Sequence, residues 1–212
     1  MEESSASARM KRIQLLALGE TDRRHVSDLG KSLAVELGRD CEVLAPEVDL
    51  SWAFNMSRRQ YSSTEILARM ANHATSETWR LLGVTSVDLY IPVLTFVFGE
   101  AQLQGMSAIV STYRLHQEFY GLPSDERLLD QRLLKEAVHE LGHTLGLTHC
   151  ENVECAMAAS HAVEWIDLKS GHFCSKCAAA AVEQNCTHLN ALGWARPRRC
   201  GISEEHSWKE RK

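Results

Sequence analysis

The sequence predicts a mixed α/β (α+β) fold in which helices pack against one twisted mixed sheet and a small cysteine-rich part follows. Two observations support this prediction. Between residues 12 and 146, short apolar runs alternate with segments of helical period, as in an α/β layer. Beyond residue 146, the segments become short and are interrupted by cysteine and glycine. With 212 residues, 44% of them hydrophobic, the chain can form one core with a small appendage.

The first elements are a strand, a helix and a second strand. Residues 12–19 (RIQLLALG) form an apolar run that ends in glycine, which predicts a buried strand. Residues 22–37 carry apolar side chains at helical spacing after Thr21 and Asp22, either of which can cap a helix. Residues 41–50 (CEVLAPEVDL) indicate a second strand that Pro46 interrupts.

The later elements are a helix, three strands and a long helix. Residues 63–83 place Ile66, Met70, His73 and Trp79 roughly on one side, which predicts an amphipathic helix. Three strand-like runs follow, and a last helix is predicted from Ser124 or Asp125 to Gly146. The three runs are 87–93 (VDLYIPV), 95–103 (TFVFGEAQL) and 106–113 (MSAIVSTY).

The change at residue 146 predicts how the chain is divided. We expect an α/β subdomain over 12–146 and a C-terminal subdomain over 147–195. Residues 1–11 and 196–212 are polar and are expected to be flexible tails.

Charge and composition exclude several classes of partner. A net charge of -5 argues against nucleic acid and anionic membranes, which attract a basic face. No apolar run reaches the roughly 18 residues that a membrane span needs. The first twelve residues contain no hydrophobic segment of the kind found in signal peptides, so we expect a cytoplasmic protein. In that compartment, clustered cysteines favour metal binding over disulfides. We also expect a monomer.

The segment VHELGHTLGLTH (138–149) predicts a metal site. His139 and His143 lie four residues apart on a helix, about 40° around its axis, so both imidazoles can bind one ion. A continued helix would carry His149 about 15 Å beyond His139. Gly146 can adopt the left-handed conformation that ends a helix, and the turn returns His149 to the other two. Three nitrogen ligands leave a fourth position open, as in catalytic zinc sites, and Glu140 is placed to be the general base on a zinc-bound water.

The cysteines predict a second metal site. Four of the seven cysteines occur as two pairs, and four thiolates form the closed tetrahedral set of a structural zinc. Iron in the same cage is the alternative. The four ligands are Cys150, Cys155, Cys174 and Cys177, while Cys41, Cys186 and Cys200 are expected to be free thiols.

The other histidines are weaker candidates for metal ligands. Three of them lie near the cysteines and can replace a thiolate, but the four cysteines already complete a set. These three are His161, His172 and His188. The histidines at 25, 116 and 206 are expected to be solvated, and His73 to be a packed or surface residue.

The motif from His139 to Met157, followed by CSKC (174–177), resembles the archaemetzincins, a branch of the metzincin zinc peptidases. The interval between Met157 and Cys174 is one residue shorter than in the family pattern. The resemblance extends more weakly over most of residues 12–195. It implies a metzincin-like fold with a backing helix and an active-site helix. It further implies that His139, His143 and His149 bind a catalytic zinc, that Glu140 is the base, and that Met157 lies in the Met-turn. It also implies Cys150, Cys155, Cys174 and Cys177 on a structural zinc, and an edge strand at 95–103 that binds an extended peptide.

The predicted function is zinc-dependent hydrolysis of peptide bonds, and the resemblance points to aminopeptidase-like action. Two zinc ions per chain and a peptide or protein substrate are expected. Tyr113 and Tyr120 are candidates for stabilising the tetrahedral intermediate, because they are phenols in the appropriate part of the chain. The alternative is a non-catalytic, zinc-stabilised peptide-binding protein, but the presence of Glu140 beside an open site favours catalysis.

Overall fold

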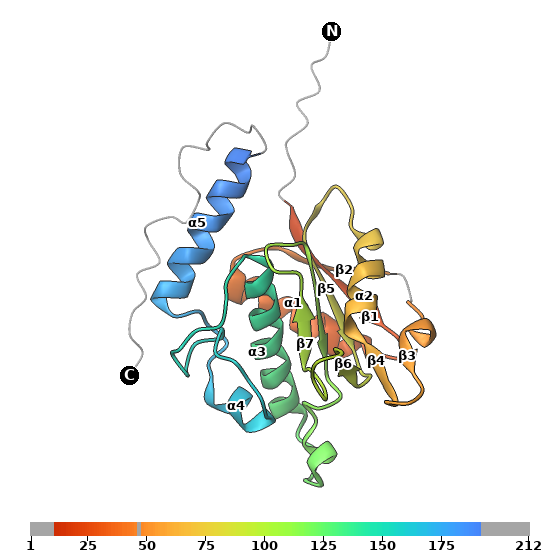
Figure 1. Cartoon of the computed structure of the whole chain (residues 1–212). Helices are drawn as coiled ribbons and strands as arrows, with labels where there is room; N and C mark the ends of the chain where they lie inside the picture. The colour runs from red at the N-terminus through yellow and green to blue at the C-terminus, as the bar shows by residue number, and fades with distance from the viewer. Residues whose placement is uncertain (1–10, 46–47, 192–212) are drawn as a thin grey trace.

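The computed structural model describes residues 11–45 and 48–191, and the side chains as far as residue 183. Among these residues, five strands form the main sheet, in the order β2-β1-β5-β8-β7, and three form a smaller sheet, in the order β3-β4-β6. Figure 1 shows the arrangement of the helices around the main sheet. The strands are β1 (Arg12–Leu18), β2 (Cys41–Val43), β3 (Phe54–Asn55), β4 (Gln60–Ser62), β5 (Thr78–Thr85), β6 (Leu89–Tyr90), β7 (Gly99–Ala101) and β8 (Ser107–Ser111). The helices are α1 (Arg23–Leu37), α2 (Ser63–Met70), α3 (Glu126–Thr144), α4 (Val163–Leu168) and α5 (Ser175–Ala191), with 3-10 turns at Ser51–Ala53, Ala71–His73 and Gln117–Tyr120.

The main sheet is mixed, as predicted. Its central strands are parallel, and β7 pairs antiparallel with β8 at one edge. Side chains on successive positions of β1 point to opposite faces. Ile13 and Leu15 pack with α1 and α3, whereas Leu16 and Leu18 pack with α2. The sheet therefore has two cores, and α1 and α3 lie on the same face.

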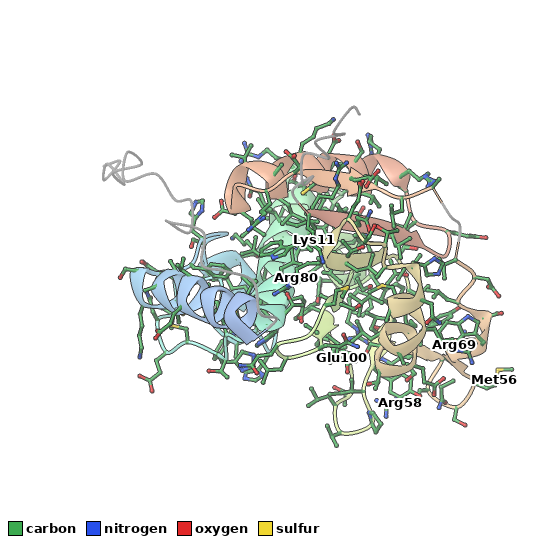
Figure 2. The ribbon with its side chains drawn as sticks, turned by 90° about the horizontal axis from the view of Figure 1, so that it is seen from above. Lys11, Met56, Arg58, Arg69, Arg80 and Glu100 are labelled. Atoms are coloured by element: carbon green, nitrogen blue, oxygen red, sulfur yellow. The ribbon has the colours of Figure 1, made fainter. Side chains whose placement is uncertain are left out.

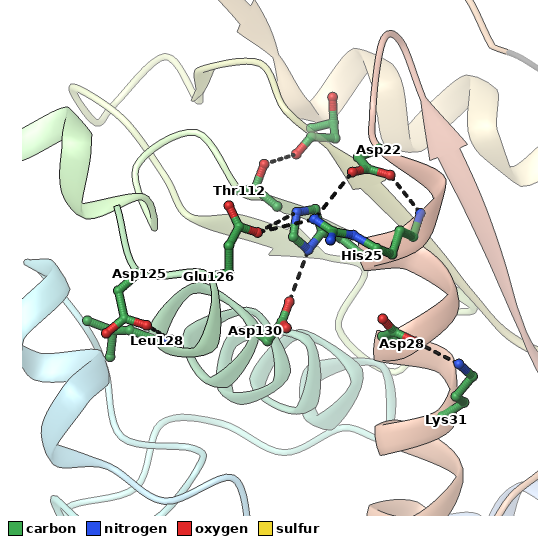
Figure 3. A network of polar contacts seen from close by, with 11 residues as sticks. Asp22, His25, Asp28, Lys31, Thr112, Asp125, Glu126, Leu128 and Asp130 are labelled. Atoms are coloured by element: carbon green, nitrogen blue, oxygen red, sulfur yellow. Dashed lines mark hydrogen bonds and ion pairs between the residues drawn. The ribbon is translucent and has the colours of Figure 1, made fainter. Parts of the chain in front are cut away.

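Polar contacts clamp α1 to α3. Asp22 caps α1 by accepting a hydrogen bond from the backbone N–H of Arg24, as predicted. His25 lies 3.3 Å from Glu126 and 3.0 Å from Asp130, both on α3 (Figure 3). Its side chain is only 12% exposed, so the expectation that His25 is solvated was wrong. The helix that carries the metal motif is thus fixed to its neighbour near its N-terminal end.

The predicted helix over 63–83 was wrong beyond residue 73. The backbone N–H of Thr75 donates to the hydroxyl of Thr78, and the N–H of Thr78 donates to the carbonyl of Thr75. This turn ends the helical segment, and Thr78–Thr85 becomes a central strand of the sheet. Trp79 followed the helical spacing of the preceding residues by coincidence. The predicted strand at 87–93 shortens to Leu89–Tyr90 in the small sheet.

The C-terminal part packs on the end of α3. Its own cluster of buried residues includes Leu147, Cys155 and Met157, and Trp79 of β5 lies against it. Arg80, labelled in Figure 2, donates to the hydroxyl of Thr144, near the end of α3. The helix α5 was not predicted. Within the described residues, no helix has the length and apolar character of a membrane span.

Several predictions lie outside the described residues. They concern the tails, apart from Lys11, the side chains of Cys186 and His188, and all of Cys200 and His206. Residues 46–47, in the interrupted second strand, are also outside; Val48 forms a bridge with Leu18.

Candidate active site and cysteine cluster

The helix α3 carries the first part of the metal motif. Asp125 caps its start by accepting a hydrogen bond from the N–H of Leu128 at 2.9 Å. His139, Glu140 and His143 lie in its last two turns, and the first two are buried. The Nε2 atoms of His139 and His143 are 3.1 Å apart, so the two imidazoles converge as their spacing predicted.

Gly146 returns the third histidine to the other two. Its φ of 88° lies in the left-handed region, and the N–H of Leu147 donates back to the carbonyl of Gly142 at 3.0 Å. The ring of His149 lies 5.3 Å from that of His139 and 5.1 Å from that of His143, between centroids. One ligand nitrogen from each of the three side chains lies within 4.8 Å of the others.

The orientation and the protonation state of the three histidines suit the binding of a cation. The Nδ1–H of His139 donates to the carbonyl of Ala156 and that of His143 to the carbonyl of Leu147, both at 2.8 Å, which leaves each Nε2 free. Burial lowers the pKa of all three imidazoles and keeps them neutral. Zinc bound tetrahedrally at 2.0–2.1 Å would separate two nitrogens by about 3.3 Å, so the observed spacing fits this ion.

Glu140 lies buried beside the histidines. Desolvation raises the pKa of its carboxyl well above the ordinary value, and the nearby carboxylate of Glu136 raises it further. The ammonium of Lys169 acts in the opposite direction. A cation on the three histidines would also lower this pKa.

A cleft of about 690 Å³ opens over the histidines and Glu140. One wall is apolar and comes from the segment 91–103, which includes β7, and the other comes from α3 and the segment 148–161. Along β7, the residues whose backbone groups bond to β8 alternate with residues whose groups point away. The backbone N–H of Ser111 donates to the carbonyl of Phe98, and that of Gln102 donates to the carbonyl of Ser107, which fixes this alternation. In that alternation, Glu100 pairs with β8, and the N–H and C=O groups of Gly99 and Ala101 point to the free edge. The prediction that 95–103 supplies an edge strand is confirmed, although only Gly99–Ala101 is regular strand.

The four predicted cysteines form a second cluster next to the first. Their sulfur atoms lie within 4.8 Å of one another, and those of Cys150 and Cys174 are 3.9 Å apart. Tetrahedral zinc with Zn–S bonds of about 2.3 Å requires about 3.8 Å between sulfurs, so the cluster fits this ion. The backbone N–H of Cys177 lowers the pKa of Cys174 to about 7, whereas burial raises the pKa of Cys155 and Cys177.

Met157 lies beneath the active-site helix, fully buried. Its sulfur is so close to Gly142 that a β-carbon on this glycine would collide with it. The backbone carbonyl of Met157 also accepts a hydrogen bond from the N–H of Cys150 at 2.9 Å. The methionine therefore contacts the turn of α3 between the two helical histidines, and its backbone binds the first cysteine.

Lys169 and Glu136 were not predicted to lie near the active site, and two histidines expected near the cysteines lie elsewhere. Lys169 is fully buried, and its ammonium lies 2.7 Å from the carboxylate of Glu136. His161 lines the cleft rather than the cysteine cluster, whereas His172 pairs with Glu36 of α1 at 2.6 Å. Glu136 stands at helical spacing from Glu140, which was a usable signal; nothing in the sequence joins it to Lys169.

The mixed sheet, the active-site helix and the three-histidine cluster define a zinc metallopeptidase, and comparison with known proteins agrees. The chain belongs to peptidase family M54, whose model matches residues 23–183. The archaemetzincin of Methanocaldococcus jannaschii is 44% identical over 167 residues, which cover 78% of this chain and 90% of the relative. That of Pyrococcus abyssi is 43% identical over 136 residues, 64% of this chain and 72% of the relative.

Solved structures show the same fold. The archaemetzincin of Methanopyrus kandleri superposes with a TM-score of 0.71 at 31% identity, covering 85% of this chain and 98% of that one. The archaemetzincin of Archaeoglobus fulgidus, solved in complex with malonate, gives 0.68 at 38% identity, covering 79% and 99%. The resemblance of the motif to archaemetzincins is therefore confirmed.

Proposed function

We propose that His139, His143 and His149 hold the zinc ion of this peptidase and that Glu140 is the general base for hydrolysis of a peptide bond. One observation carries this proposal: three neutral imidazoles converge beside a buried carboxylate, in a cleft beneath a free strand edge. A site that only stabilised the fold would need neither the carboxylate nor the open cleft.

Zinc at this site would supply Lewis-acid polarisation of the scissile carbonyl and would acidify water. Glu140 accepts a proton from the attacking water and delivers it to the leaving amine. Its buried position excludes bulk water, and its raised pKa places it closer to the neutral range, where a base can both take and return a proton. His139 and His143 keep their orientation through the carbonyls of Ala156 and Leu147.

The substrate is a peptide or protein segment, which we place in extended form along β7. The outward N–H and C=O groups of Gly99 and Ala101 can bind it as an added strand. The wall of the cleft behind them is apolar, with Ile91, Phe96 and Phe98, and favours a hydrophobic side chain near the scissile bond.

Aminopeptidase-like action is the finer form of this proposal. Glu100, labelled in Figure 2, lines the cleft, and its carboxylate accepts hydrogen bonds from the hydroxyls of Ser63 and Thr64 at the start of α2. No ion pair joins it to a basic residue in the described part of the chain, in contrast to Glu136, which Lys169 neutralises. Glu100 can therefore accept the α-ammonium group of a peptide.

We further propose a structural zinc on Cys150, Cys155, Cys174 and Cys177, which stabilises the subdomain at 147–195 against the catalytic subdomain at 12–146. The cluster leaves no open ligand position for chemistry. Four thiols that must remain reduced fit a cytoplasmic location. The net charge of -5 supports a peptide substrate over nucleic acid, and we propose a monomer.

The test combines metal analysis with one isosteric variant. Glu140→Gln should retain two zinc ions per chain and lose hydrolysis of a peptide library by about 10²–10⁴-fold, because it removes only the base. Glu164→Gln, on the surface of α4, is the matched control and should keep full activity. Faster hydrolysis of peptides with free amino termini than of peptides with acetylated amino termini would support the aminopeptidase form.

The alternative function predicts different results. If purified protein holds zinc only on the cysteines, or if Glu140→Gln hydrolyses peptides as the natural chain does, the catalytic assignment fails. A non-catalytic, zinc-stabilised peptide-binding protein would then be the better description.

A further inference from the structure

Peptide hydrolysis passes through a tetrahedral intermediate whose oxyanion needs a hydrogen-bond donor inside the cleft. Besides the three clustered histidines and Glu140, six polar side chains line this cleft: Thr95, Glu100, Glu136, Thr148, Ser160 and His161. Ionised carboxylates cannot donate, which excludes the two glutamates. Neither Tyr113 nor Tyr120 lines the cleft, and the hydroxyl of Tyr120 already donates to the carbonyl of Arg114 at 2.9 Å.

The remaining donors are the hydroxyls of Thr95, Thr148 and Ser160 and the imidazole of His161. The hydroxyl of Ser160 is buried without a hydrogen-bond partner among the described residues, whereas His161 is exposed in the cleft and has a ring contact to Trp165 that positions it. His161 lines the cleft together with His149. Within the described part of the chain, neither of its ring nitrogens has a hydrogen bond or an ion pair. An imidazole carries at least one N–H in both its neutral and its protonated form, so this donor is present across the working pH range.

The fold holds His161 from two sides. The chain just before it is tied to the active-site helix, because Ala156 accepts from His139 and Ala158 accepts from Lys169 at 3.3 Å. Lys169 is itself fixed by Glu136, on α3. On the other side, the ring of His161 packs against Trp165 of α4, at 5.6 Å between centroids and an angle of 68°. The donor is thus positioned before substrate arrives, which is what oxyanion stabilisation requires.

We infer that His161 is a catalytic residue that donates an N–H hydrogen bond to the oxyanion of the tetrahedral intermediate; this inference rests on the proposed peptidase function. Attack by water forms the new C–O bond, moves the π electrons of the carbonyl onto its oxygen and gives the water proton to Glu140. Collapse re-forms the carbonyl, breaks the C–N bond and returns that proton to the amine. His161 transfers no proton in either step and stabilises only the charge on the oxygen.

The decisive variant is His161→Phe, which keeps a ring against Trp165 but removes the donor. We expect kcat to fall by about 10²–10³-fold with KM changed by less than about twofold, because the lost contact exists only in the transition state. The affinity for a phosphinic peptide, which mimics the tetrahedral intermediate, should fall by a similar factor in calorimetry, while zinc content stays the same. His161→Asn and His161→Gln place an amide N–H near the two ring nitrogens, and at least one should restore part of the loss.

Controls separate this inference from its alternatives. His116→Phe replaces a histidine that does not line the cleft and should leave kinetics and inhibitor affinity unchanged. The inference is overturned if His161→Phe keeps its kcat, if the loss falls on KM alone, or if Thr148→Val or Ser160→Ala loses kcat in its place. Inactivity of the zinc-loaded natural chain would overturn the proposed function as well, and this result is distinct from the other three.

Discussion

Gly99 sets the distance between the edge strand and Glu140. A β-carbon at this position would lie 2.6 Å from the Cγ of Glu140 and 2.6 Å from the backbone carbonyl oxygen of Ile109. The second neighbour is backbone and cannot move cheaply, so no side chain fits between the strand and the active-site helix. The absence of a side chain thus lets the free edge of β7 pass directly over Glu140.

Gly99→Ala should therefore impair catalysis more than folding. We expect kcat/KM to fall at least about tenfold because Glu140 is displaced, and the free energy of unfolding to fall by about 1–3 kcal/mol from overpacking. Zinc content should not change, since none of the proposed ligands lies in the collision. Gly30→Ala is the control: its β-carbon would be 3.7 Å from its nearest neighbours, and activity should be retained. Unchanged kinetics in Gly99→Ala would show that the strand can retreat.

At the scale of elements, a buried ion pair joins the active-site helix to the segment that precedes α5. Lys169 is fully buried, lies 2.7 Å from Glu136 and donates to the carbonyl of Ala158. Its neighbours are α3 on one side and the chain just after Met157 on the other. Removing either charge leaves the other one buried and uncompensated, which costs more than the pair contributes.

Lys169→Met should lower the free energy of unfolding by about 3–5 kcal/mol, measured by urea denaturation, because the carboxylate of Glu136 loses its partner. The double variant Lys169→Met/Glu136→Leu removes both charges and should recover most of the loss. If the double variant is as unstable as the single one, the lysine acts through packing or through Ala158, not through the ion pair.

Elements with strong local signals were predictable from the sequence, and those that depend on distant partners were not. The spacing of His139, His143 and Gly146 follows from helix geometry, so the histidine cluster could be placed without coordinates. The helical spacing that began at Ile66 continued to Trp79, but the Thr75–Thr78 turn and the pairing of β5 between β1 and β8 overrode it. The Glu136–Lys169 pair and the position of His161 depend on how the chain returns after Met157, which residue types alone do not encode.

At the scale of the whole molecule, two clusters of possible ligands meet at consecutive residues. His149 belongs to the histidine cluster and Cys150 to the cysteine cluster. The first lies beneath the catalytic cleft, whereas the second lies in the C-terminal core with Leu147 and Met157. A disturbance of the cysteine cluster can therefore reach the third histidine through one peptide bond. We expect the proposed histidine site to lose its metal without disturbing the C-terminal core, because that core is formed around the cysteines.

Metal removal should reveal this asymmetry. A mild chelator near neutral pH should take one zinc from the exposed side of the cleft and abolish hydrolysis, leaving amide-exchange protection over 147–183 unchanged. Acidification makes protons compete with the metal for the thiolates, so at lower pH the second zinc should leave and that protection should fall. Cys174→Ser/Cys177→Ser should reproduce the second state at neutral pH and also weaken zinc binding by the histidines. Metal analysis combined with hydrogen-exchange mass spectrometry distinguishes the steps. Simultaneous loss of both ions, or full protection in the cysteine variant, would contradict a structural role for the second site.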